Sequence, residues 1–168
     1  MSDVRIRAAR PGELAEVGEL TVAAYRADGL LTHDAGDSYA GELRDARARA
    51  EQAELLVAVD GTGTLLGTVT VTRAGTPYAE LARDDELEFR MLAVAGHARG
   101  RGVGEALVTA VLDRARELAA PRVVLCSLDA MRTAHRLYER LGFRRAPERD
   151  WYPVPGLALR AFVHDRLR

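Results

Sequence analysis

The stretch from Arg99 to Glu105, which reads Arg-Gly-Arg-Gly-Val-Gly-Glu, limits most strongly what this chain can fold into. It lies between an apolar run that ends at Val94 and a helical pattern that continues to Leu118. Glycines at alternate positions allow a sharp turn whose N–H groups converge on an anion where a helix begins. The helix dipole and the two arginines add positive charge at the same place. The stretch therefore predicts a phosphate or diphosphate site at a strand-to-helix turn.

Two other kinds of phosphate loop do not fit this stretch. A Walker loop needs Lys followed by Ser or Thr, and the chain contains no Lys. A Rossmann fingerprint stands near the start of a repeating βαβ chain, whereas here about half of the chain precedes the glycines. Taken alone, the loop could also serve packing only, with Arg99 and Arg101 as solvated surface charges.

The composition favours one globular domain over residues 1–168. An apolar fraction of 48% at this length permits a sizeable core. The formal net charge of −1 gives no general attraction to nucleic acid or to an anionic membrane. The single cysteine, Cys126, excludes an intrachain disulfide, and no N-terminal apolar segment resembles a signal peptide or a membrane span. We therefore expect a cytoplasmic protein that binds neither nucleic acid nor membrane.

Hydrophobic periodicity predicts the elements that precede the glycine loop. A strand is expected over residues 4–8, broken by Pro11-Gly12, and an amphipathic helix from Leu14 that Asp28-Gly29 stops. A loop over 30–39 and a largely exposed helix over 40–53 come next. A β-hairpin over 55–72, a polar loop over 75–85 and a strand over 87–94 follow. Alternation along the last strand places four side chains on one face, those of Glu88, Arg90, Leu92 and Val94.

The elements after the loop suggest a βαβ crossover. Pro121 ends the long helix, and the apolar run 123–128 reads as a strand buried on both faces, parallel to and beside strand 87–94. A helix over 131–141 is stopped by Gly142, and a strand begins at Phe143. A loop over 148–156 and a final strand over 157–165 close the chain. We expect the final strand to be exposed, so that it could pair across a homodimer.

Two motifs occur in order along this pattern. The first consists of Arg99, Gly102 and Gly104; the second consists of Ala134, Leu137-Tyr138 and Gly142-Phe143. Together they resemble the signatures Arg/Gln-x-x-Gly-x-Gly/Ala and Ala-x-x-Leu-Tyr…Gly-Phe of the GNAT superfamily of acetyltransferases. The resemblance covers nearly the whole chain. It implies an α/β (α+β) fold with a central mixed, mostly antiparallel sheet of about seven strands, a splayed parallel pair and about four flanking helices.

The resemblance also implies how acetyl-CoA is bound. Its diphosphate would be held by the loop residues Arg99, Gly100, Arg101, Gly102, Val103, Gly104 and Glu105. Its pantetheine arm would pair with backbone groups of Leu92, Ala93 and Val94, and the N–H of Leu92 could polarise the thioester carbonyl. Met131 stands where the family commonly has an Asn that reaches the pantetheine. That contact is therefore lost or replaced by Ser127, Asp129 or water.

Acetyl transfer to an amine needs a base, because an ammonium ion has no lone pair. An alkylamine resembles Lys, whose reference pKa is about 10.4. The resemblance makes Tyr138 the candidate general acid at the thioester sulfur and places Glu88 where some members carry their base, while others use water or another residue. From the residues alone, Tyr138 could instead be a core tyrosine, and Glu88 could pair with Arg90.

These inferences predict an acetyl-CoA-dependent N-acetyltransferase that transfers the acetyl group to a primary amine by direct attack in a ternary complex. The acceptor is a small-molecule amine or a peptide or protein amine; Trp151 and Tyr152 could line its site or pack the terminal sheet. The alternative is a non-catalytic acyl-CoA-binding or regulatory module. No metal is expected, because the four histidines lack metal-ligand spacing, and Cys126 reads as a small core residue.

Overall fold

Strand β4 (Leu87–Val94) is shared by two compact units of the protein. The structure is a computed structural model that describes residues 3–31 and 34–165. The first unit comprises Met1–Val71 and Met91–Ala110, and the second comprises Thr72–Arg90 and Val111–Arg168. The boundary therefore falls within β4, between Arg90 and Met91.

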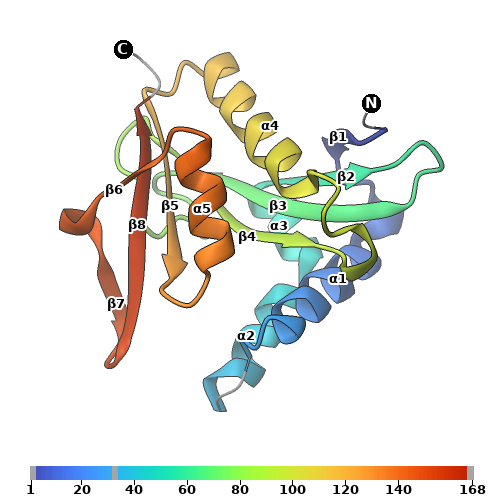
Figure 1. Ribbon diagram of the computed structural model, residues 1–168, viewed down its shortest axis with the longest axis horizontal. Coiled ribbons are helices and arrows are strands. Elements are labelled where there is room, and N and C mark those ends of the chain that lie inside the picture. Colours follow the sequence, from blue (N-terminus) through green and yellow to red (C-terminus); the bar gives the residue numbers. More distant parts are fainter. Residues whose placement is uncertain (1–2, 32–33, 166–168) are drawn as a thin grey trace. The chain divides into compact units, whose positions relative to one another are not determined.

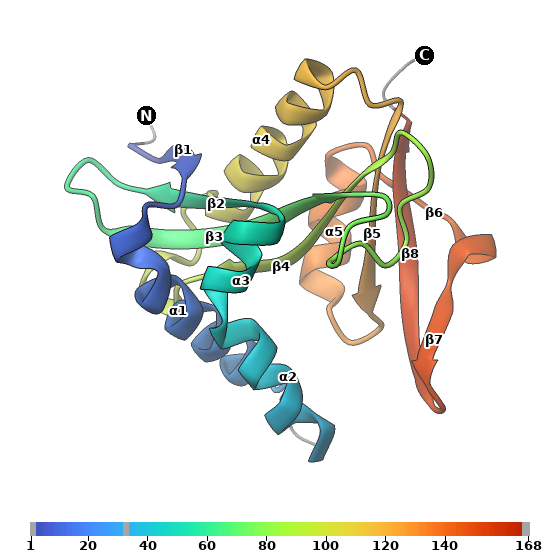
Figure 2. The same ribbon diagram turned by 180° about the vertical axis from the view of Figure 1, so that it is seen from behind.

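The first unit is built on three antiparallel strands, β1 (Arg5–Ala8), β2 (Glu54–Val59) and β3 (Leu65–Arg73) (Figure 1). The predicted strand and hairpin are confirmed. Apolar residues of β2 and β3 pack with residues of α1 (Leu14–Ala27) and α3 (Ala46–Gln52), and Figure 2 shows both helices on the same side of these strands. The core cluster consists of Val17, Ala46, Leu55, Val57, Val59 and Leu65.

Two predictions about the early helices were wrong. The predicted loop over 30–39 is helical from Asp34, where α2 (Asp34–Arg44) begins. The predicted single helix over 40–53 is broken at Asp45, whose side chain accepts the N–H of Ala48 at 3.1 Å and caps α3. Packing of α2 against α1 outweighs the weak helix propensity of this segment. The two helices approach so closely that a Cβ at Gly18 of α1 would collide with the carbonyl of Arg44.

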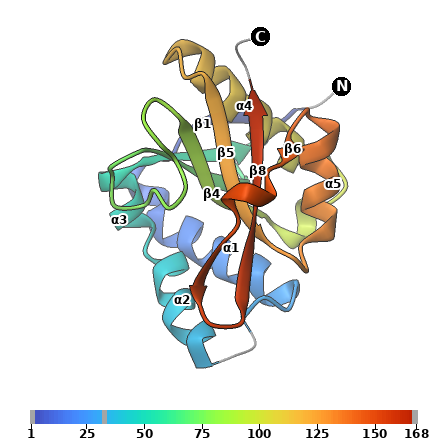
Figure 3. The ribbon, with the colours of Figure 1, turned by 90° about the vertical axis from the view of Figure 1, so that its left-hand side faces the viewer.

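The second unit contains β5 (Arg122–Leu128), β6 (Arg144–Arg145), β7 (Trp151–Val154) and β8 (Leu157–Asp165), with α5 (Arg132–Arg140). The predicted parallel neighbours are confirmed, since β4 and β5 pair at Leu87↔Val123 and Glu88↔Val124. Figure 3 shows β5 and β8 side by side, in agreement with their antiparallel ladder from Arg122↔Asp165 to Leu128↔Leu159.

The terminal segment also departs from prediction. The predicted loop over 148–156 contains the 3-10 turn η3 (Pro147–Arg149) and strand β7, which pairs with β8. Strand β8 is therefore not the exposed edge that we expected, because β5 pairs with it on one side and β6 and β7 pair with it on the other. The expected dimer contact through this strand loses its basis.

The strands are hydrogen-bonded in the order β1-β2-β3-β4-β5-β8-β6, with β7 paired to β8. This is the mixed, mostly antiparallel sheet that was predicted, with one more strand than the expected seven. Met91 interrupts the pleat of β4, because its φ of 57° lies in the left-handed region. The strict alternation that placed Glu88 and Leu92 on one face therefore fails at Met91. Within the described ranges, no helix is long and apolar enough to cross a membrane.

Candidate functional site

The glycine loop forms the predicted turn into a helix within the first unit. It follows the 3-10 turn η2 (Gly96–Ala98) and leads into α4 (Val103–Glu117). Gly100 and Gly102 have φ values of 80° and 75°, which strongly favour glycine. The N–H of Ala106 makes a helical bond to the carbonyl of Gly102 at 3.0 Å. The N–H groups of residues 103–105 therefore precede this bond and point out of the helix end, as an anion site requires.

Space above these glycines also fits a ligand. A Cβ added to Gly100 or to Gly102 would meet no atom within 4 Å. The two glycines are thus needed for backbone conformation and not for close packing against the rest of the protein. An open, amide-lined turn beside two arginines suits the diphosphate of a nucleotide-type cofactor.

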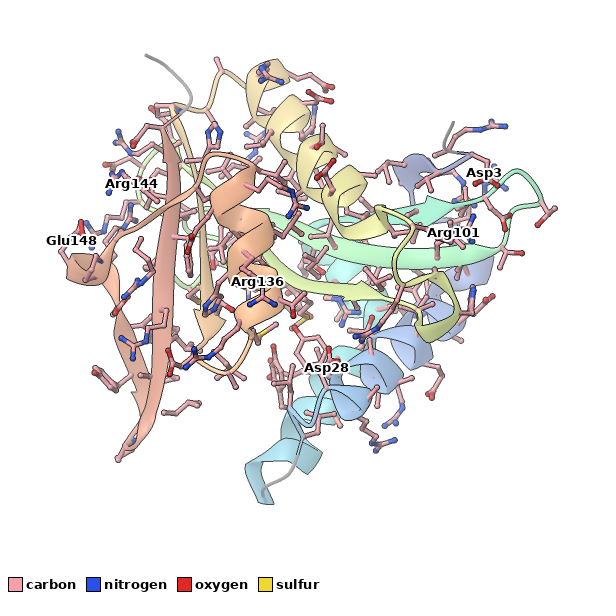
Figure 4. The ribbon with its side chains drawn as sticks, viewed as in Figure 1. Asp3, Asp28, Arg101, Arg136, Arg144 and Glu148 are labelled. Atoms are coloured by element: carbon pink, nitrogen blue, oxygen red, sulfur yellow. The ribbon has the colours of Figure 1, made fainter. Side chains whose placement is uncertain are left out.

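Both arginines of the loop contact carboxylates in the first unit. Arg99 contacts Asp28 through two nitrogens, at 3.0 and 3.2 Å. Arg101 contacts Asp3 at 3.0 Å, and Figure 4 labels both of these residues. All four side chains are at least 39% exposed, so each ion pair contributes about 0–1 kcal/mol and would exchange readily for a phosphate.

Backbone N–H and C=O groups at the end of β4 point toward both edges of the strand. The N–H of Ala95 donates to the carbonyl of Leu66 on β3 at 2.8 Å. Successive residues of a strand direct their N–H and C=O groups to opposite edges. The groups of Val94 therefore face the edge of β4 away from Leu66, where a pantetheine arm could pair with them.

Tyr138 lies in the second unit, on α5, inside an aromatic cluster. Its ring centroid is 5.8 Å from that of Phe89, 5.9 Å from Phe143 and 5.7 Å from Phe162. Burial raises the pKa of the Tyr138 hydroxyl above its usual value of 10.0. Over the part of the chain that the structure describes, the hydroxyl makes no hydrogen bond. It is therefore a protonated group with a proton to donate.

Glu88 is fully buried and holds a loop. Its Oε1 accepts the backbone N–H groups of Glu80, Leu81 and Ala82 at 3.0, 2.9 and 2.9 Å. Its Oε2 is buried without a hydrogen-bond partner in the described residues. The alternative pairing of Glu88 with Arg90 does not form, because Nε of Arg90 contacts Oε1 of Glu80 instead, at 3.1 Å.

Sequence reasoning missed the residues that surround Glu88. One oxygen of Glu80, one oxygen of Glu88 and Sγ of Cys126 lie within 4.8 Å of one another, and we call these three residues the acceptor cluster. Burial raises the pKa of the Cys126 thiol to about 12, so the thiol stays protonated. Glu80 lies in a polar loop with several acidic residues, and no local signal separates it from them.

The predicted site residues thus fall into two groups. The loop residues and the end of β4 lie together in the first unit. Tyr138 and Glu88 lie in the second, against opposite faces of β4, since Phe89 contacts the Tyr138 ring while Glu88 faces the loop 80–82. Helix α5, which carries Tyr138, begins after Met131, and the Met131 side chain does not cap it. The Ser127 hydroxyl, suggested as a replacement for the missing Asn, instead lies 3.1 Å from Nε2 of His135.

Known proteins resemble this chain in sequence and in fold. The sequence pattern of the Acetyltransferase (GNAT) family matches residues 17–143, more than half of the chain. An N-acetylaspartate synthetase from Danio rerio is 39% identical over 74 residues, which are 44% of this chain and 26% of that protein. The chain therefore spans about a quarter of the length of this curated relative.

Solved structures share the fold over nearly the full chain. A GCN5-related N-acetyltransferase from Kribbella flavida has a TM-score of 0.69 at 25% identity and covers 97% of this chain and 98% of its own. The PaiA N-acetyltransferase from Thermoplasma acidophilum, solved in complex with coenzyme A, has a TM-score of 0.75 at 14% identity. It covers 98% of this chain and 99% of its own.

Proposed function

Because the chain belongs to the Acetyltransferase (GNAT) family, we propose that it is an acetyl-CoA-dependent N-acetyltransferase whose acceptor is a primary amine. The observation that carries the proposal is the turn at Gly100 and Gly102, which opens the N-terminus of α4 between two arginines. Acetyl-CoA is the donor whose diphosphate this turn suits.

Donor binding uses the first unit. The N–H groups of residues 103–105 bind the diphosphate, and Arg99 and Arg101 exchange their carboxylate partners for phosphate oxygens. The pantetheine arm pairs with backbone groups of Leu92 and Val94. The groups of Ala93, the third predicted residue, face β3, since its carbonyl lies beside Gly67. The N–H of Leu92 donates to the thioester oxygen as charge develops on it.

The transfer proceeds by direct attack. The acceptor ammonium first loses a proton to the base, and the neutral amine attacks the acetyl carbonyl. A C–N bond forms, the C–S bond breaks, and the departing sulfur takes a proton to give free CoA. The amide nitrogen loses its second proton, so the net products are an acetamide, CoA and one proton.

Tyr138 and Glu88 are the proposed acid and base. Burial raises the pKa of the Tyr138 hydroxyl and keeps it protonated, so it would donate a hydrogen bond to the sulfur as thiolate charge develops there. The free thiol has a pKa of about 8.5, so this donation helps transfer without being indispensable. The Oε2 atom of Glu88 has no partner among the described residues, which leaves it available to receive the ammonium proton, directly or through water.

The acceptor class is guided by the relatives. Several matched proteins are named N-acetylaspartate synthetase, although the chain spans only about a quarter of each. We therefore propose a small amino acid as acceptor, with L-aspartate as the first compound to test.

Two assays test the function with purified full-length protein. Titration calorimetry with acetyl-CoA measures donor binding, and release of free CoA is followed in the presence of L-aspartate and a panel of small amines. We expect binding with one site per chain and amine-dependent release of CoA. Tyr138→Phe and Glu88→Gln should slow the release. The Tm of Glu88→Gln is measured alongside, because Glu88 also holds the loop 80–82.

The outcomes separate the proposal from its rival. Donor binding with no CoA release for any amine, and no effect of either substitution, would favour the non-catalytic acyl-CoA-binding module. Absence of binding with Gly102 and Gly104 intact would exclude both.

A further inference from the structure

The acceptor cluster, Glu80, Glu88 and Cys126, contains a buried acceptor atom that the protein itself does not satisfy. Oε2 of Glu88 lies out of contact with solvent and has no hydrogen-bond partner in residues 3–31 and 34–165. An unsatisfied buried carboxylate oxygen costs about 1–3 kcal/mol or more, so its persistence points to a ligand.

The spacing of the cluster fits one small donor. Its three ligand atoms lie within 4.8 Å of one another, so a single atom at their centre would be about 2.8 Å or less from each. That is the length of a hydrogen bond from an ammonium nitrogen. An alkylammonium group has three N–H donors, one for each atom.

Charge decides which cation belongs there. Nε of Arg90 lies 3.1 Å from Oε1 of Glu80, and Nη1 of Arg90 donates to the carbonyl of Tyr78 at 3.1 Å, which fixes the guanidinium. Two carboxylates beside one guanidinium in direct contact favour a cation as ligand, although Arg149, paired with Glu86, also acts on Glu88. A divalent metal would need the Cys126 thiol to ionise, which its burial opposes.

We propose that Glu80, Glu88 and Cys126 bind the ammonium group of the acceptor before transfer, with Glu80 as the residue that selects the charged amine. The inference rests on the proposed N-acetyltransferase function and deepens it. Glu88 is anchored by three amides and keeps the loop in place, whereas the side chain of Glu80 is 26% exposed and forms the solvent side of the cluster. The ammonium group would lie between the partly exposed carboxylate of Glu80 and the buried carboxylate of Glu88.

Glu80→Gln is the informative substitution, because Glu88→Gln would also release the loop 80–82 and could fail to fold. The matched control is Glu148→Gln, an exposed glutamate on η3 that Figure 4 labels. Ligand-observed NMR with ethylammonium chloride measures binding directly in wild type and in both variants. We expect wild-type binding to be weakened at least tenfold by Glu80→Gln and to be unchanged by Glu148→Gln.

Kinetics provide the second measurement with any amine that is turned over. Glu80→Gln should raise the KM for the amine about tenfold and leave the KM for acetyl-CoA unchanged. It also removes the carboxylate partner of Arg90, so a lower Tm is expected too, whereas a merely structural residue would lower the Tm without a selective rise in the amine KM. Cys126→Ala, which removes one weak acceptor, should raise the amine KM only about twofold.

Three results would overturn the inference: equal ethylammonium binding by wild type and Glu80→Gln, a drop in Tm that accounts for the loss, or stoichiometric binding of zinc that depends on Glu80 and Cys126. A different result would overturn only the enzyme function. If wild type binds ethylammonium through Glu80 but releases no CoA with any amine, the cluster is a cation site in a non-catalytic protein.

Discussion

Tyr138 is a buried tyrosine whose proposed role as general acid can be tested by removing one atom, its hydroxyl oxygen. Its hydroxyl lies among the rings of Phe89, Phe143 and Phe162, and burial raises its pKa. We predict that Tyr138→Phe lowers kcat by about one to two orders of magnitude, since the thiolate must then take its proton from water. The Kd for acetyl-CoA, measured by calorimetry, should stay within about twofold.

Tyr152→Phe is the control for this substitution, because Tyr152 is 67% exposed and loses the same hydroxyl without entering the aromatic cluster. A tenfold loss of kcat in this control, or unchanged kcat in Tyr138→Phe, would contradict the proposed role of Tyr138.

Glu86 is the centre of a charged network in the second unit. Its carboxylate accepts two nitrogens of Arg149 at 2.7 and 2.9 Å and Nε of Arg122 at 2.9 Å. Removing one partner of a buried pair leaves the other charge uncompensated, so Glu86→Gln should lower the free energy of unfolding by about 3 kcal/mol. Urea denaturation measures this loss, and Glu148→Gln should leave the stability unchanged.

The same network makes stability depend on acid. Burial alone would raise the pKa of Glu86, but the hydrogen bonds from Arg149 and Arg122 lower it from 4.5 to about 2. A carboxyl whose pKa is lowered on folding stabilises the protein above its unfolded pKa. That stabilisation is lost as the pH falls from about 4.5 toward 2. Stability curves of wild type should fall more steeply across this range than those of Glu86→Gln, and parallel curves would contradict the assignment.

At the scale of elements, Gly67 on β3 determines how closely β3 approaches its neighbours in the first unit. A Cβ there would lie 2.7 Å from the carbonyl oxygen of Ala93 and 2.9 Å from Cγ1 of Val103. The carbonyl belongs to the backbone and cannot move aside. Gly67→Ala should therefore lower the free energy of unfolding by about 1–3 kcal/mol. It should also weaken acetyl-CoA binding, because Ala93 and Val103 belong to the predicted donor site.

Gly61→Ala tests whether this effect is local. Gly61 lies in the turn before β3, and a Cβ there would meet no atom within 4 Å. Chemical denaturation and calorimetry should find it close to wild type. Equal losses in both variants would show that glycine content, and not the close approach at Gly67, explains the effect.

Elements whose periodicity is strong were predicted correctly, and those stabilised mainly by distant contacts were not. Strands β2 and β5 are nearly continuous apolar runs, and β3 alternates β-branched residues, patterns that any sheet would bury. Helix α2 begins in a segment of weak helix formers and packs on α1 through Gly18, a contact between residues far apart in the sequence. Strand β7 exists only as the partner of β8.

At the scale of the whole molecule, the candidate-site residues likewise fall into those that a local motif predicts and those that only the fold brings together. The turn that we propose as the donor site was predictable because its glycines and the helix N-terminus occupy consecutive residues. The acceptor cluster was not, because Glu80 and Cys126 come within 3.7 Å only through the sheet and its covering loop. Glu88 was named from its strand position, but its hold on residues 80–82 depends on tertiary structure.

Donor binding should therefore be visible in the stability of the whole chain. A ligand that binds only the folded state at 100 times its Kd adds about 2.7 kcal/mol. For a chain of this size that raises the Tm by about 5–10 °C. Acetyl-CoA should produce this shift in scanning calorimetry.

Pantetheine, which lacks the diphosphate, should produce almost none at the same concentration, because the N–H groups of residues 103–105 and the two arginines would bind nothing. Equal shifts from both compounds, or no shift from acetyl-CoA, would contradict a diphosphate site at the N-terminus of α4. High salt should reduce the acetyl-CoA shift, since Arg99 and Arg101 are exposed and their charges are screened.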